Sequence, residues 1–386
     1  MNPRRAYLII PKLIEQSTWG GSYIAGIKGW KDTPVARMKI GQSYELSSNS
    51  FLSLAETTAD PSFAPELQGV PENSLSISQL IGADPEGVLG TEGVQKFHGS
   101  LKTLIKFTQG KGNSFQLHVK PGTPSHWIPK PESWYYIQSG KATLGLARGI
   151  DLVEYEDECR RLEEFMNKLS ERLHAKQIPL DEARRTAQEE IANSGIYTFV
   201  NTVPIPEGSV VDLDQGGVHH SWEEDDAVLP QGNILYEVQV DVPDVMSTIR
   251  SFDKGKILDD GSVRPLQIAD YFKYIDTNPA FNNPDRLIHP PKALGQTQNS
   301  QAWLLFDTDY YRTSKISFRH DLPPDRAQTG GTTFHHYFVL SGSMAYKGQT
   351  TKIAVGTGHS LFIPAAVEQF TLTAGEEGTT VLKTYL

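Results

Sequence analysis

The residues from 103 to 146 decide the fold class of this sequence. They read Thr103-Leu-Ile-Lys-Phe107, Ser114-Phe-Gln-Leu-His-Val119, Trp134-Tyr-Tyr-Ile137 and Ala142-Thr-Leu-Gly-Leu146. Short aromatic and β-branched runs bounded by Gly and Pro are typical of a many-stranded sandwich or barrel. The same character returns from residue 196 to 240 and again from 302 to 386. The sequence therefore predicts a mainly β protein with two related barrels.

Residues 151–195 interrupt this pattern with helical periodicity. One apolar stripe consists of Leu162, Phe165, Met166, Leu169 and Leu173, and a second consists of Ala183, Ala187 and Ile191. Apolar residues three and four positions apart share one face of a helix. Pro179 lies between the two stripes and Gly195 follows the second, which are typical helix boundaries. The segment is predicted to be a helical hairpin that packs on the sheet.

Composition and charge exclude several classes of protein. The chain has 386 residues, of which 38% are hydrophobic and 21% are charged, which is typical of a globular protein and not of a disordered one. The formal net charge of −10 disfavours nucleic acid and anionic membranes as partners. Cys159 is the one cysteine, so an internal disulfide is excluded and a reducing compartment is expected. The apolar run that begins at Ala6 stops at Pro11, too early for a secretory signal, and a cytoplasmic location is expected.

Three spaced motifs carry the candidate chemistry. Gln116 and His118 are two residues apart on a predicted strand, so both side chains face one barrel interior. Glu132 opens the next strand, and His219 follows a glycine turn, a strand and a second turn at Gly216-Gly217. The last arrangement is typical of the second half of a cupin metal motif. Two nitrogens and two oxygens suit a divalent metal such as zinc, with an open position for water or substrate.

Each motif alone has a plainer interpretation, because a single inward histidine in a barrel is more often a hydrogen-bonded core residue. The spacing of all three together favours the metal site. The second β block lacks an equivalent set. Gly358 and Pro364 repeat the motif spacing, but Gln369 occupies the ligand position, and the adjacent His335 and His336 face opposite sides of a strand. The C-terminal barrel is therefore predicted to hold no metal.

An ordered set of motifs resembles the type I mannose-6-phosphate isomerases, which are zinc-dependent double-cupin enzymes. The matching segments, in chain order, are Trp19-Gly-Gly21, Tyr44-Glu-Leu-Ser47, Ser114-Phe-Gln-Leu-His118, Lys130 to Tyr135, Gly216-Gly-Val-His219, Tyr236-Glu-Val-Gln239 and Thr248-Ile-Arg250. The resemblance covers nearly the whole chain. Four departures are that Tyr44 replaces a Trp, that Ile249 replaces a Tyr, that Val119-Lys120 separate His118 from Pro121, and that the stretch after Pro121 lacks the usual acidic residues.

The resemblance implies a fold of two cupin, or jelly-roll β-barrel, domains with a helical insertion. Residues 1–150 and 196–300 would form a catalytic metal-binding cupin, 151–195 a helical hairpin, and 301–386 a C-terminal cupin without metal. One Zn²⁺ per chain would be held by Gln116, His118, Glu132 and His219.

The resemblance also implies the reaction, the interconversion of mannose 6-phosphate and fructose 6-phosphate through a cis-enediol. Arg250 and Lys130 would be catalytic, and Ser114, Lys120 and Lys256 would bind the sugar phosphate. The sequence does not identify the base that moves the proton, the natural sugar or the oligomeric state. Two alternatives remain open, a metal-dependent cupin of another class such as a dioxygenase, and a non-catalytic sugar-binding cupin.

Overall fold

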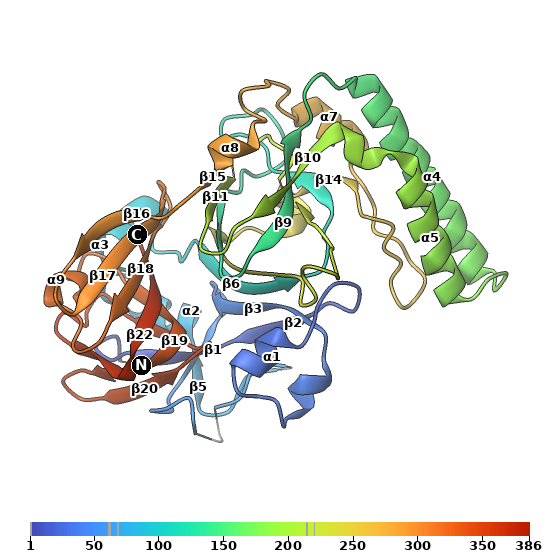
Figure 1. Ribbon diagram of the computed structural model, residues 1–386. Coiled ribbons are helices and arrows are strands. Elements are labelled where there is room, and N and C mark those ends of the chain that lie inside the picture. The colour runs from blue at the N-terminus through green and yellow to red at the C-terminus, as the bar shows by residue number, and fades with distance from the viewer. Residues whose placement is uncertain (1, 61–62, 68, 214, 220) are drawn as a thin grey trace.

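The structure is a computed structural model that describes residues 2–60, 63–67, 69–213, 215–219 and 221–386. Strands dominate it, as the sequence predicts. Figure 1 shows the C-terminal strands, which form the second barrel, on one side of the molecule, the first barrel in the middle, and two long helices along the opposite flank. Within the described ranges, no helix has the length and apolar character needed to cross a membrane.

Three sheets enclose the candidate site. The largest runs in the order β15 (Ile288–His289), β11 (Val210–Leu213), β8 (Glu132–Tyr136), β13 (Asn233–Val240), β6 (Thr103–Gly110), β3 (Ile40–Leu46) and β2 (Lys12–Glu15). The second is β10 (Val200–Ile205), β9 (Gly140–Leu146) and β12 (Ser221–Trp222), and the third pairs β14 (Ile249–Phe252) with β7 (Phe115–Leu117). Every residue of β6 is buried, because this strand lies between two neighbours and is covered on both faces.

The C-terminal sheet forms the second barrel. Its order is β16 (Lys292–Gln296), β17 (Ser300–Asp307), β18 (Arg312–Phe318), β22 (Thr371–Tyr385), β19 (His335–Lys347), β21 (Ser360–Ile363), β1 (Tyr7–Ile10), β4 (Phe51–Ser53) and β5 (Ser74–Ser76), and β20 (Lys352–Gly356) pairs with β19. Its apolar face packs on the outer face of the first barrel, where the rings of Phe107 and Phe338 lie 5.3 Å apart.

Strands from the N-terminal region complete this second sheet, so the sheets divide the chain differently from the expected boundaries. Tyr7 pairs with Phe362 and Leu8 pairs with Leu361, although residues 1–150 are expected in the first barrel and only 301–386 in the second. All four residues of β1 are buried. A strand that is apolar on both faces is stable only where both faces are covered. Its position between β21 and β4 in the C-terminal sheet provides that cover.

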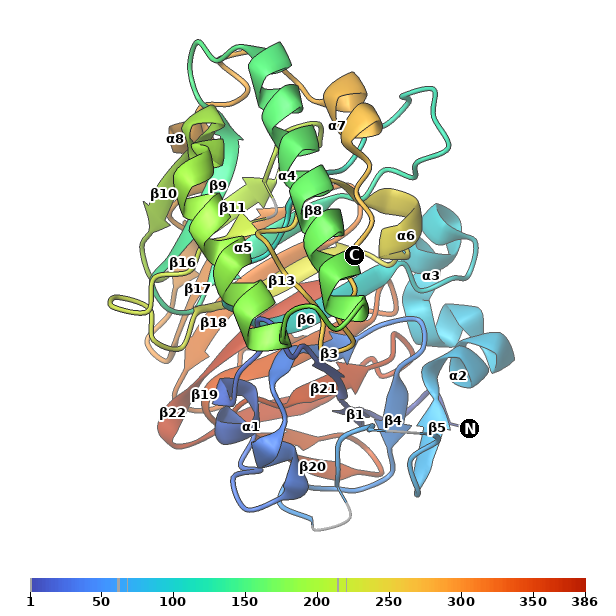
Figure 2. The same cartoon turned by 90° about the vertical axis from the view of Figure 1, so that its right-hand side faces the viewer.

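Short helices occupy the connections, and two longer ones form the insertion. They are α1 (Tyr23–Ile27), α2 (Ile77–Ala83), α3 (Pro85–Phe97), α4 (Leu152–His174), α5 (Leu180–Ser194), α6 (Asp244–Ser247), α7 (Ile268–Tyr274), α8 (Pro284–Leu287) and α9 (Pro324–Ala327), with 3₁₀ turns η1 (Pro34–Arg37) and η2 (Ile196–Phe199). Figure 2 shows α4 and α5 side by side. Asp151 caps α4, and Gly195 ends α5 in the left-handed conformation at φ 70°.

Buried histidines and a buried ion pair join the two barrels. Lys28 Nζ lies 2.7 Å from Glu45 Oε1, and Ser360 donates a hydrogen bond of 2.8 Å to Glu45 Oε2. His336 Nδ1 lies 3.3 Å from the Tyr236 hydroxyl, and His359 Nε2 lies 3.1 Å from the carbonyl of Lys28. Burial, with a smaller effect of the Lys28 charge, lowers the pKa of both His336 and His359 to about 3.

Acid should therefore destabilise this junction. Unfolding returns each histidine to its ordinary pKa near 6.5, so below that pH the unfolded chain binds protons that the native chain does not. The stabilisation is complete above pH ~6.5 and is lost, toward pH ~3, at about 1.4 kcal/mol per pH unit and histidine. Urea unfolding of His336→Gln and His359→Gln between pH 7 and 5 should show a shallower loss than the wild type, and the exposed His320→Gln should match the wild type. If the unfolding free energy falls with pH equally steeply in all variants, His336 and His359 are not the cause of the acid destabilisation.

Candidate metal centre and active site

Backbone pairing brings Gln116, His118 and His219 together. The amide of His219 donates to the carbonyl of Gln116 over 3.2 Å, and the amide of Gly216 donates to the carbonyl of His118 over 2.7 Å. Residues 216–219 thus run beside β7 as a further strand would. Gly216 has φ +93°, and a Cβ there would lie 2.8 Å from the Lys120 side chain. A glycine is needed at this turn for both reasons.

Both imidazoles are oriented by backbone carbonyls. His118 Nδ1 lies 2.7 Å from the carbonyl of Ser247, and His219 Nδ1 lies 2.5 Å from the carbonyl of Gly217. A carbonyl only accepts, so each Nδ1 carries the proton and each Nε2 keeps its lone pair. The two rings lie 5.1 Å apart between centroids. Burial lowers the pKa of His118, and burial together with His118 lowers that of His219 to about 3, so both rings stay neutral.

Glu132 and Gln116 add two oxygens to these nitrogens. Glu132 Oε2 lies 3.3 Å from His118 Nε2, and Glu132 Oε1 accepts from the Trp134 indole over 2.8 Å. The Ser114 hydroxyl donates to Gln116 Oε1 over 2.9 Å. The exposed fractions of these four donor residues are at most 3%. The structure therefore brings together the four residues that the motif spacing selects.

The donor chemistry of this set fits a divalent metal ion. His118 Nε2 and Glu132 Oε2 both offer lone pairs to the same space, an arrangement that a cation between them would stabilise. Donors at ~2.0–2.2 Å from a tetrahedral zinc lie roughly 3.3–3.5 Å apart, close to the 3.3 Å observed between these two atoms. Over the described ranges, no three His, Cys, Asp or Glu side chains are arranged as a finished metal centre, so the fit rests on the donors themselves.

Lys130 and Arg250 meet at one carboxylate. Lys130 Nζ lies 2.9 Å from Asp244 Oδ1 and 3.6 Å from Glu132 Oε2, and Arg250 Nη2 lies 3.7 Å from Asp244 Oδ2. β14 pairs with β7 so that Arg250 lies opposite Gln116. Desolvation raises the pKa of Asp244, but Lys130, Lys106 and Arg250 outweigh it and hold that pKa well below its usual range. Asp244 thus orients both cations beside the donor set.

The three residues expected to bind substrate lie in different surroundings. Ser114 contacts Gln116, as described above. Lys256 Nζ donates to the carbonyl of Gly112 and lies 5.8 Å from the Trp19 ring centroid. Lys120 is ion-paired with Asp276, its side chain is 47% exposed, and no described contact links it to Lys130, Arg250 or Lys256. The four cations expected near the substrate therefore do not form a single cluster.

A buried pair on the inner faces of β6 and β13 has no role assigned from the sequence, although Glu237 lies within the segment Tyr236-Glu-Val-Gln239. Lys106 Nζ lies 2.9 Å from both Glu237 Oε1 and Gln239 Oε1. Glu237 pairs across the sheet with Trp134, and Gln239 with Glu132, so these side chains share the face of the metal ligands. Burial and the nearby Glu132 raise the pKa of Glu237 to about 7, with Lys106 opposing. The sequence signal for this pair was a charged residue, Lys106 or Glu237, within each of two predicted strands.

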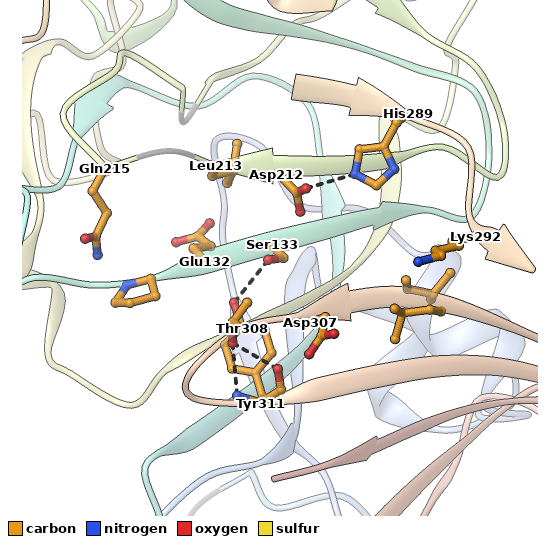
Figure 3. A pocket seen from close by; sticks show the side chains of 13 residues that line it. Glu132, Ser133, Asp212, Leu213, Gln215, His289, Lys292, Asp307, Thr308 and Tyr311 are labelled. Carbon is orange, nitrogen blue, oxygen red and sulfur yellow. Dashed lines mark hydrogen bonds and ion pairs between the residues drawn. The ribbon is translucent and has the colours of Figure 1, made fainter. Parts of the chain in front are cut away.

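A pocket of about 450 Å³ lies where the two barrels meet. It borders Glu132 and is lined on one side by Ser133 and Asp212 and on the other by Thr308 and Tyr311, as Figure 3 shows. The Tyr311 hydroxyl donates to Ser133 over 3.2 Å. Because neighbouring residues of β8 face opposite sides, Ser133 lies on the outer face of the sheet while Glu132 faces His118. The pocket therefore lies behind the strand that carries Glu132.

Solved structures with the same fold cover 98–99% of the chain. The mannose 6-phosphate isomerase from Bacillus subtilis superposes with a TM-score of 0.67 at 14% identity over 99% of both chains. The Salmonella typhimurium mannose 6-phosphate isomerase, bound to its substrate and to zinc, has a TM-score of 0.64 at 12% identity over 98% of this chain and 99% of its own. A putative mannosephosphate isomerase from Archaeoglobus fulgidus has a TM-score of 0.62 at 16% identity over 99% and 97%. No family model and no curated protein matches the sequence. The chain has the fold of the mannose-6-phosphate isomerases.

Proposed function

We propose that this chain is a zinc-dependent aldose–ketose isomerase that interconverts mannose 6-phosphate and fructose 6-phosphate. The observation that carries the proposal is the convergence of Gln116, His118, Glu132 and His219 with Lys130 and Arg250 in one barrel. The fold shared with mannose-6-phosphate isomerases over 98–99% of the chain supports it. In this proposal, a dioxygenase and a non-catalytic cupin are the alternatives to be excluded by experiment.

The reaction moves a proton between C1 and C2 of the sugar and places negative charge on the neighbouring oxygens. Gln116, His118, Glu132 and His219 would hold the metal, which when bound supplies Lewis-acid stabilisation of that charge. The Arg250 guanidinium adds a fixed positive charge. Lys130 is held toward Glu132 by Asp244, where its ammonium would donate hydrogen bonds to the sugar oxygens. Lys256 and Ser114 would bind the phosphate end.

Glu237 is the group best suited to move the proton. A general base works best when its pKa lies near the working pH, and the carboxyl of Glu237 has a pKa of about 7 on the face that carries the metal ligands. The Lys106 ammonium holds this carboxyl in place over 2.9 Å. Glu237 thereby takes the role that the sequence left unassigned.

Substrate turnover tests the proposal directly. We expect the zinc-loaded protein to interconvert mannose 6-phosphate and fructose 6-phosphate in a coupled assay, and to act more weakly on unphosphorylated mannose and on other hexose phosphates. The control is the same protein after chelation of its metal, which should be inactive and regain activity with zinc. A zinc-loaded protein that converts none of the panel would exclude the proposed reaction.

The pH dependence of kcat/KM should follow the ionisation of Glu237. Deprotonated Glu237 is the active base, so kcat/KM should fall about tenfold per pH unit below its pKa near neutrality. Lys106→Met removes the charge that opposes the raised pKa, and the acid limb should then move upward by about one pH unit. The exposed Lys102→Met is the matched control and should leave the limb in place. If the acid limb of the kcat/KM profile stays in place in Lys106→Met, the ionisation that controls it belongs to a group other than Glu237.

A further inference from the structure

The loop after β14 carries Lys256 and is held from two sides. It runs from Asp253 to Ile257, and it joins the strand of Arg250 to the turn at 258–262, of which residues 258–260 are exposed. Asp253 Oδ1 lies 3.3 Å from Arg264 Nη1, and burial together with the Arg264 charge lowers the pKa of Arg250. Asp253 acts on Arg250, Arg264 and Lys256, and Glu224 is a second carboxylate near Lys256. Under the proposed function, the Lys256 ammonium is the group of this loop that an anionic substrate group would contact.

Helix α5 holds the loop from outside. Gln188 Nε2 donates to the carbonyl of Lys254 over 3.4 Å, and Arg184 donates to the carbonyl of Ile257 from Nε over 3.2 Å and from Nη2 over 2.8 Å. Between these contacts, Gly255 has φ +65°, and a Cβ there would lie 2.2 Å from Ile191 Cδ1. Positions 184, 188 and 191 follow helical spacing, so one face of α5 lies along the loop.

A buried ion pair holds the loop from inside. Lys254 Nζ is paired with Glu223, and both side chains are 6% exposed. Glu223 Oε1 also accepts from the Thr143 hydroxyl on β9 over 2.5 Å. Removing two charges from water is costly and is offset only by a well-formed pair. The pair connects the loop to the β10–β9–β12 sheet, and it takes no part in the metal site.

We infer that α5, through Arg184, Gln188 and Ile191, and the Lys254–Glu223 pair position Lys256 and so determine how the protein recognises the anionic group of its substrate. The inference rests on the proposed function for the identity of that group. It gives the helical insertion a role beyond packing, because α5 is the element that contacts the backbone on both sides of Lys256. These are positioning residues, since none of them reaches the donor set.

Arg184→Met tests the inference, with Arg185→Met as the matched control on the same helix. Arg185 is exposed and makes no described contact with the loop. We expect Arg184→Met to raise KM for the hexose 6-phosphate about tenfold while kcat stays within about twofold. Arg184→Lys keeps a donor and should recover part of the loss. Unphosphorylated hexose should show the same KM in all variants.

Amide hydrogen exchange gives a readout that does not depend on turnover. Exchange at residues 254–257 should be faster in Arg184→Met, and also in Gln188→Met, than in Arg185→Met or the wild type. If wild-type protein turns over hexose phosphates but Arg184→Met and Arg185→Met have equal KM and equal exchange, the inference is overturned while the proposed function stands. If zinc-loaded wild type converts no hexose phosphate, the proposed function fails, and equal exchange would still overturn the positioning role of α5.

Discussion

The His118→Ala, His219→Ala double variant is expected to bind no zinc and to lose roughly 10³-fold or more of its isomerase activity, because a bound metal supplies several kcal/mol of charge stabilisation. The two rings supply both nitrogens of the donor set, and each is oriented by a backbone carbonyl. Two remaining oxygens cannot hold zinc against water. We expect one equivalent of zinc per wild-type chain by elemental analysis and a small fraction of an equivalent in the variant.

The matched control replaces two histidines elsewhere, in His126→Ala, His320→Ala. Both are exposed, so this variant should keep its zinc and its activity. Metal retained by the His118, His219 double variant, or two equivalents in the wild type, would show that the metal lies elsewhere or that a second site exists. Iron in place of zinc in the purified protein would favour the dioxygenase alternative.

Arg250→Ala is expected to lower kcat and kcat/KM together by roughly 10²-fold, in line with the loss of one oxyanion-stabilising donor. The guanidinium stays protonated at any working pH, so it stabilises charge and does not move protons. Its side chain is 14% exposed and lies 3.7 Å from Asp244. Its Nε is buried and has no acceptor among the described residues.

The competing outcome distinguishes charge stabilisation from phosphate binding. If Arg250 only binds the phosphate, Arg250→Ala should chiefly raise KM, and unphosphorylated sugar should be insensitive to the change. The exposed Arg319→Ala serves as the control. Steady-state kinetics with zinc content checked decides between them, and an unchanged kcat with wild-type zinc would exclude the catalytic role.

The fold class could be predicted from the sequence because it depends on short-range patterns, and the candidate donor set could be proposed from it because the motifs have a characteristic spacing. Alternation places Gln116 and His118 on one face, and the start of β8 places Glu132 beside them. Turn glycines bring in His219. The helical stripe of 151–195 likewise follows from spacing alone. The fold class and the helical insertion involve residues that are near in sequence, whereas β7 and β8 belong to different sheets that the folded barrel brings together.

The cation arrangement could not be predicted in this way. Lys120 is near His118 in sequence, yet its ammonium is paired with Asp276, more than a hundred residues away. Lys106 and Glu237 are separated by 131 positions, and only the pairing of β6 with β13 brings them to the same face as the ligands. Lys130 and Asp244 are likewise 114 positions apart, although Asp244 is near Arg250 in the sequence.

The sequence by itself determined the β architecture, the helical insertion and the candidate ligands, because period-two and period-3.6 patterns encode which face a side chain takes. Only the tertiary structure decided that β1 completes the C-terminal sheet, that Glu237 shares the metal-ligand face, and that α5 holds the loop of Lys256. These contacts join segments far apart in the chain. Burial and charge pairing in the folded protein determine which residues form these contacts, and local sequence patterns do not indicate them.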